Sequence, residues 1–64
     1  MSAGTIISSR RKLLHMTQRE LAEILCVSAQ AVSNWERDES LPDTAILIPL
    51  SKALQIEVID ILEG

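Results

Sequence analysis

Two helix starts that lie close together constrain the fold of this chain more than any other feature. Thr17 is followed three residues later by Glu20, the spacing of a capping box, in which each side chain satisfies a backbone N–H group at the start of a helix. Ser28 is a second good N-cap residue. The sequence therefore predicts helices over residues 18–25 and 29–36, with only about three residues between them.

Side-chain sizes at fixed positions fit two helices that cross closely. Ala22 is the fifth residue counted from Gln18, and its small side chain lets the second helix approach the first. Val27, Val32 and Trp35 occupy positions that fill the angle between the two helices. This pattern is more specific than amphipathicity and indicates a helix-turn-helix unit.

Cap and turn signals divide the remaining sequence into further helical segments, and strand signals are absent. These segments cover about residues 3–14, 45–54 and 57–62, so the chain is predicted to be all-α with about five helices. Pro49 lies inside the apolar stretch 45–54. Because an interior proline removes a hydrogen bond and clashes with the preceding turn, at a cost of ~3 kcal/mol, we expect this helix to be kinked or to begin late.

The length allows one domain, residues 1–64, with an aliphatic core. Below ~70–80 residues a single core rarely supplies more than ~3–5 kcal/mol, so the packing must be efficient or a partner must help. Apolar residues make up 47% of the chain, but they include one Trp and no Phe or Tyr. The residues expected to face the core are Ile6, Ile7, Leu14, Leu21, Ile24, Leu25, Ala31, Val32, Trp35, Val58, Ile61 and Leu62.

Several classes of protein are disfavoured by composition. Cys26 is the only cysteine, so no internal disulfide and no Cys/His metal cluster can form, and we expect a cytoplasmic protein without metal or cofactor. Cys26 is interpreted as a semi-buried turn residue, and His15 as a helix C-cap. No apolar run approaches the ~20 residues that span a bilayer, and no signal peptide is recognisable. One His, one Cys and no Gly-rich loop leave no catalytic constellation, so an enzyme is not expected.

The net charge of −3 argues against a nucleic-acid binder if it is taken alone. Its distribution along the chain is uneven. Residues 1–37 contain five cations and three acids, whereas residues 38–64 contain one cation and six acids. The charge is therefore polarised along the chain, with the positive excess in its first half.

A resemblance to a known family rests on four stretches of sequence: Thr17-Gln18-Arg19-Glu20-Leu21-Ala22, Val27-Ser28, Val32-Ser33-Asn34-Trp35-Glu36 and Leu41-Pro42-Asp43. Together they resemble the phage-repressor and Cro-like, or XRE-type, helix-turn-helix DNA-binding domains. The resemblance covers nearly the whole chain. It implies a five-helix bundle in which helices two and three form the motif, at about residues 17–37, and the third is the recognition helix.

The resemblance also implies which residues contact double-stranded DNA. The base-reading positions fall on Ala29, Gln30, Ser33 and Asn34. Gln30 and Asn34 are the strongest candidates, because each amide can pair in a bidentate manner with adenine, worth ~1–3 kcal/mol of discrimination. The DNA backbone contacts are expected from Thr17, Gln18, Arg19, Ser28 and Arg37.

Other positions carry structural expectations. Arg11 and Glu36 match a partly buried ion pair of the family, whose disruption costs ~3–5 kcal/mol. His15, Cys26 and Gln55 stand where relatives usually have glycine, so each is expected to adopt a left-handed conformation at a cost of order 1 kcal/mol. The loop at Asp38 and Glu39 is acidic, so the DNA affinity of an isolated monomer should be modest.

An apolar surplus at Ile46, Ile48 and Ile59 admits two interpretations. It is either a slightly rotated core or a homodimer interface that places two recognition helices about 34 Å apart. The favoured function is that of a sequence-specific transcriptional regulator that acts as a dimer on a short inverted-repeat operator. Repression is favoured over activation. The alternatives are a protein-protein interaction module on the same scaffold, and a DNA-binding antitoxin or restriction-modification controller.

Overall fold

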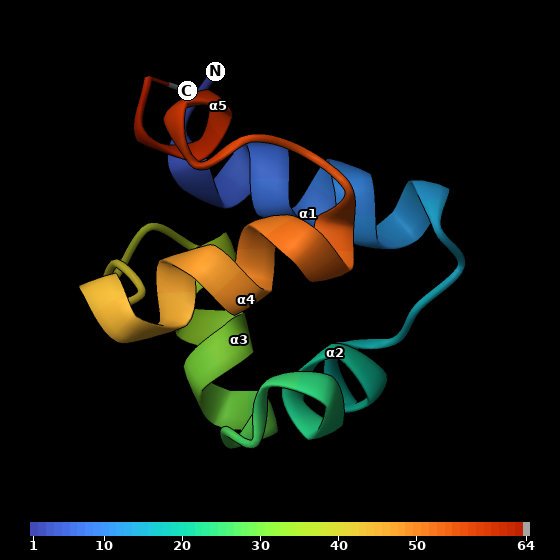
Figure 1. Cartoon of the computed structure of the whole chain (residues 1–64). Coiled ribbons are helices and arrows are strands. Elements are labelled where there is room, and N and C mark those ends of the chain that lie inside the picture. The colour runs from blue at the N-terminus through green and yellow to red at the C-terminus, as the bar shows by residue number, and fades with distance from the viewer. Residues whose placement is uncertain (64) are drawn as a thin grey trace.

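The computed structural model describes residues 1–63, which form five helices and contain no strand (Figure 1). The helices are α1 (Ala3–Leu13), α2 (Gln18–Leu25), α3 (Ala29–Glu36), α4 (Thr44–Leu54) and α5 (Val58–Leu62). α1 packs against α3, α4 and α5, and α2 packs against α3 and α4. The predicted all-α bundle with a helix-turn-helix at the second and third helices is confirmed.

The first four helices begin at side-chain N-caps. Ser2, Thr17, Ser28 and Asp43 each accept a hydrogen bond from the backbone N–H group three residues later. At Thr17 the capping box is complete, because the backbone N–H group of Glu20 donates to the Thr17 hydroxyl at 3.0 Å and that of Thr17 donates to the Glu20 carboxylate at 2.8 Å. These caps satisfy donors that a helix start leaves without internal partners, and they fix where α2 and α3 begin.

Four helices are followed, within two residues, by a residue in the left-handed conformation. His15, Cys26, Asp38 and Gln55 have φ between 57° and 60°. At each, its own N–H group and that of the following residue donate to carbonyls of the last helical turn, as in His15 to Lys12 and Met16 to Arg11, both at 3.0 Å. This is the Schellman arrangement, which glycine usually completes. The prediction for His15, Cys26 and Gln55 is confirmed, and Asp38 is a fourth such residue.

Glycine at two of these helix ends is expected to stabilise the domain. Cys26→Gly and Gln55→Gly each remove a side chain from a left-handed residue, which should raise the free energy of unfolding by ~0.5–1 kcal/mol after the greater freedom of glycine in the unfolded chain is subtracted. Urea unfolding followed by circular dichroism measures the change. Asp38→Gly is the control: it relieves the same strain but loses a tertiary hydrogen bond, so it should give no gain. A lower unfolding midpoint for Cys26→Gly and Gln55→Gly would contradict this account of the helix ends.

The core is aliphatic apart from one tryptophan. Its buried members are Ile7, Leu21, Ala22, Leu25, Val32, Trp35, Leu50, Leu54 and Ile61. Two predicted core residues are wrong, because Ile24 is 58% exposed and Leu62 is 62% exposed. α3 crosses α2 on the Ala22 side, which turns Ile24 outward, and the short α5 buries only Ile61. Cys26 is also exposed rather than semi-buried, since it lies at the turn outside the packed helices.

α4 does not begin late. It starts at Thr44 and continues through Pro49, which lies on the exposed side of the helix. Proline has no N–H group to donate to the carbonyl of Ala45, but Ala45 is exposed, so the missing bond is not lost inside the core. The expectation that Pro49 delays the helix start is therefore wrong.

α1 approaches the end of α3 very closely at Gly4. A Cβ atom at this position would lie 2.5 Å from the carbonyl oxygen of Trp35 and 2.7 Å from that of Glu36. The Gly4 N–H group donates to the Asp38 carboxylate at 2.9 Å. The Ser2 hydroxyl and this N–H group lower the pKa of Asp38. Gly4 and Asp38 thus join the start of α1 to the end of the helix-turn-helix unit.

Candidate nucleic-acid interface

The outward side of α3 presents the residues expected to read bases. Ala29 and Gln30 are exposed, and Ser33 and Asn34 are half-buried. The opposite side of the helix is anchored in the core, where Val32 and Trp35 are buried. This division holds the polar side at the surface on a rigidly packed helix.

The amides on this surface are hydrogen-bonded to one another. Gln30 Nε2 donates to Asn34 Oδ1 at 3.0 Å, and Arg37 Nη2 donates to the same oxygen at 2.7 Å. Arg37 also donates to the carbonyl of Ser33 at 3.3 Å and pairs with Glu39 at 3.1 Å. From the sequence, Glu39 is expected only to weaken DNA binding through its negative charge. In the structure it pairs with Arg37, because the chain reverses direction at Asp38.

The start of α2 holds the residues expected to contact phosphates. Thr17 caps the helix, and Gln18 and Arg19 occupy its first turn, where backbone N–H groups have no acceptor within the helix. The side chain of Gln18 is directed inward, with its Nε2 donating to Glu36 Oε1 at 3.0 Å. Its backbone, rather than its side chain, is therefore available to an anion. Ser28 caps α3 and is exposed.

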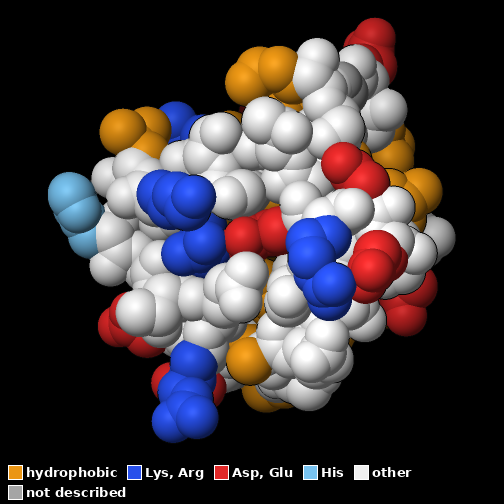
Figure 2. All heavy atoms as spheres, turned by 180° about the vertical axis from the view of Figure 1, so that it is seen from behind, with side chains coloured by type: hydrophobic (Ala, Val, Ile, Leu, Met, Phe, Trp, Pro, Cys, Tyr) orange, Lys and Arg blue, Asp and Glu red, His pale blue; other side chains and the backbone are white. Residues whose placement is uncertain are grey.

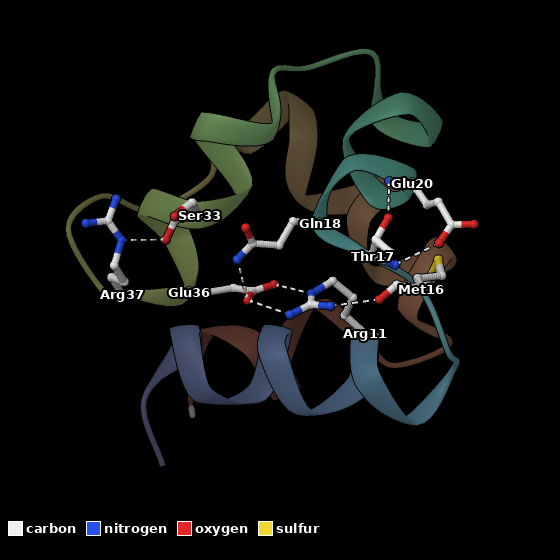
Figure 3. Close-up of polar contacts among 8 residues, drawn as sticks. All are labelled: Arg11, Met16, Thr17, Gln18, Glu20, Ser33, Glu36 and Arg37. Atoms are coloured by element: carbon white, nitrogen blue, oxygen red, sulfur yellow. Dashed lines mark hydrogen bonds and ion pairs between the residues drawn. The ribbon is translucent and has the colours of Figure 1, made fainter.

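Beneath this surface, Arg11 and Glu36 form a buried ion pair (Figure 3). Arg11 Nε donates to Glu36 Oε2 at 2.7 Å and Nη2 donates to Oε1 at 3.1 Å, and Nη1 reaches the carbonyl of Met16 at 2.7 Å. The two side chains are only 10% and 7% exposed. Arg11 thereby ties α1 to the end of α3 and to the segment that leads into α2.

The ion pair also sets the charge state of Glu36. Burial by itself raises the pKa of this carboxyl group, but hydrogen bonds from Arg11 and Gln18 and the charge of Arg11 outweigh it, so the pKa lies below the ordinary value of 4.5. Glu36 is therefore an anion at neutral pH. Its charge is neutralised by Arg11 and is not presented to a ligand.

Charges of both signs are interspersed on the face shown in Figure 2. The basic side chains there do not form one continuous patch, because acidic side chains lie between them. In residues 1–63 there is no pocket and no cluster of three potential metal ligands. No helix in this part of the chain is both long and apolar enough to cross a bilayer.

The three isoleucines of the expected apolar patch differ in exposure. Ile48 is 56% and Ile59 is 57% exposed. Ile46 is half-buried and packs against the core. Ile46 therefore fits the interpretation as core, and of the three isoleucines only Ile48 and Ile59 are exposed.

Comparisons with known proteins place this arrangement in a family. A family model described as helix-turn-helix matches residues 7–61. The chain is 45% identical over its whole length to the HTH-type transcriptional regulator DicA of Escherichia coli (strain K12), of which it covers 47%. It is 43% identical over 95% of its length to repressor protein C2 of Salmonella phage P22, of which it covers 28%. The chain thus spans less than half the length of each of these two relatives.

The fold of the chain is also similar to that of a solved structure. The crystal structure of the P22 c2 repressor protein in complex with a synthetic operator matches with a TM-score of 0.97 at 41% identity, covering 100% of this chain and 97% of that one. The five helices, the capped α2–α3 unit and the match over residues 7–61 agree with one another. The chain therefore belongs to the helix-turn-helix family, in its phage-repressor or XRE-like branch.

Proposed function

We propose that this chain is a sequence-specific DNA-binding domain of a transcriptional regulator that acts on a short inverted-repeat operator. The observation that carries the proposal is the outward side of α3, where Gln30 and Asn34 present amides from a helix whose other side is buried. Such a helix fits the major groove, whose base edges amides can distinguish. The operator complex of the P22 c2 repressor, a relative with the same fold, supports this choice of ligand.

Contacts with the phosphates of the DNA backbone would position α3 in the major groove. The first turn of α2 offers free N–H groups at the positive end of the helix dipole, and Thr17, Arg19 and Ser28 add exposed donors around it. This set carries little net positive charge, so a single domain should bind modestly. Repression follows if the bound protein occludes a promoter. In this function the chain needs no metal, cofactor or catalytic group.

The proposal includes a homodimer on DNA. An inverted repeat presents two half-sites about one helical turn, ~34 Å, apart, and a two-fold symmetric dimer matches that spacing. Ile48 and Ile59 provide exposed apolar side chains on α4 and α5, which are not part of the helix-turn-helix unit. Pairing through these helices would leave both copies of α3 free.

Selection from a random duplex pool at two salt concentrations tests the function. We expect an inverted repeat, weaker binding at the higher salt concentration, and loss of preference at one base pair per half-site in Gln30→Ala, worth ~1–3 kcal/mol. Gln55→Gly removes an exposed amide from the far end of α4 and serves as the matched control, with an unchanged preference. Absence of specific and of salt-sensitive binding, even with dimerisation enforced, would contradict the proposal.

A protein-interaction module is the second candidate, and the distribution of charge favours it. Residues 38–64 contain six acids and one cation, which is unfavourable near phosphates and suited to a basic protein partner. In that case the salt-dependent selection above returns no operator.

A further inference from the structure

We propose that Asn34 presents only hydrogen-bond donors to DNA and therefore reads guanine or thymine, while Gln30 reads adenine, and that Arg37 and Glu39 are the positioning residues that fix this polarity. The inference rests on the proposed DNA-binding function and specifies its base preference. It replaces the expectation that both amides pair with adenine in the same bidentate way.

The orientation of the Asn34 amide follows from the chemistry of its neighbour. A guanidinium group has five donors and no acceptor, so the Asn34 atom that lies 2.7 Å from Arg37 Nη2 must be the oxygen. The bond is charge-assisted, which makes it stronger than an amide-amide bond. Gln30 Nε2 donates to the same oxygen at 3.0 Å. With two donors on Oδ1, the acceptor of Asn34 is occupied and the two hydrogens on Nδ2 remain for DNA.

Arg37 is held in place by two hydrogen bonds and one ion pair. Besides Asn34, it donates to the carbonyl of Ser33 at 3.3 Å and pairs with the Glu39 carboxylate at 3.1 Å. Glu39 lies beside Arg37 because Asp38 reverses the chain in the left-handed conformation, and the Glu39 N–H group donates to the carbonyl of Asn34 at 2.9 Å. Arg37 is thus directed along α3, with its charge partly neutralised, instead of extending towards a phosphate.

The free groups match different base edges. Guanine offers two acceptors, N7 and O6, in the major groove, and thymine offers O4, so both suit the donors of Asn34. Adenine has a donor, N6, beside its acceptor N7, so only one of the two Asn34 N–H groups could find an acceptor there. Gln30 keeps its oxygen and one N–H group, the combination that pairs with adenine N6 and N7.

Operator selection with three variants tests the proposal. Asn34→Asp retains an oxygen for Gln30 and Arg37 but turns an acceptor towards DNA, so the preferred base at the Asn34 position should change from guanine or thymine to cytosine, by about 5- to 150-fold. The preference at the Gln30 position should stay the same. Arg37→Met frees the Asn34 amide to rotate, so adenine should become acceptable at the Asn34 position while the salt dependence changes little.

Arg19→Met is the matched control, because it removes an equal charge from an exposed arginine on α2. A phosphate contact of this kind should lower affinity for all sequences alike and reduce the salt slope by about 1. If Arg37→Met behaves in that way, or if the unaltered protein selects adenine at the Asn34 position, the inference is overturned while the proposed function stands. If the unaltered protein selects no operator, both fall.

Discussion

Replacing Arg11 by methionine is expected to remove most of the free energy of unfolding of this protein at 25 °C. The substitution leaves the Glu36 carboxylate, which is 7% exposed, without its two bonds from the guanidinium group, and it leaves the Met16 carbonyl without its donor. Breaking a buried ion pair from one side costs ~3–5 kcal/mol, and the lower end applies here because Gln18 still donates to Glu36. A domain of this size has only ~3–5 kcal/mol to lose. Urea unfolding at neutral pH, followed by circular dichroism, measures the loss.

Two further variants separate charge burial from general damage. Arg11→Met combined with Glu36→Met buries no charge, so it should recover much of the lost stability. Arg19→Met removes an exposed arginine and should change the free energy of unfolding by less than ~0.5 kcal/mol. If Arg11→Met costs no more than Arg19→Met, the ion pair does not hold α1 to the helix-turn-helix unit.

Alanine at Gly4 is expected to destabilise the protein, although alanine is normally the better helix residue by ~1 kcal/mol. The added Cβ atom would meet the carbonyl oxygens of Trp35 and Glu36 at 2.5 and 2.7 Å, and backbone atoms cannot move aside as a side chain can. Forcing α1 away from α3 should cost ~1–3 kcal/mol net, as other overpacked sites do. Thermal unfolding should show a midpoint lower by about 4–8 °C for each kcal/mol.

The control for Gly4 is an exposed position on the same helix. Ser9→Ala should leave the midpoint unchanged or raise it slightly, since only helix propensity changes. Adding Asp38→Ala to Gly4→Ala should not restore stability, because the two backbone oxygens remain. A midpoint for Gly4→Ala equal to that of the unaltered protein would mean that α1 can shift without cost.

The parts of the fold that local chemistry determines could be predicted from the sequence. Thr17 and Glu20 form a capping box with their own backbone neighbours, so the start of α2 is readable without any tertiary contact. Ala22 and Trp35 revealed how α2 and α3 cross, because close crossing demands a small residue at one place and a large one at another. The left-handed helix ends at Cys26 and Gln55 required comparison with a family pattern, since neither residue type indicates that conformation by itself.

Contacts between distant segments could not be predicted. Gly4 appears in the sequence as a weak helix residue, and Asp38 as an acid in a loop, yet they are joined by a hydrogen bond across 34 positions. The spacing of apolar residues could not predict that Ile24 is exposed, because its exposure depends on which side of α2 the next helix covers. In the candidate site, the positions on α3 followed from the family resemblance, but the occupied oxygen of Asn34 depends on the side-chain conformation of Arg37, three residues along the chain, which the sequence does not indicate.

Tryptophan fluorescence of this protein comes from a single residue. Trp35 is its only aromatic residue, and it is 6% exposed among aliphatic side chains on the inner side of α3. Its emission should shift to longer wavelength when the core opens to water. A DNA titration should leave that emission wavelength nearly unchanged, because bases would meet the opposite side of the helix. Loss of packing in a variant can thus be distinguished by fluorescence from loss of recognition.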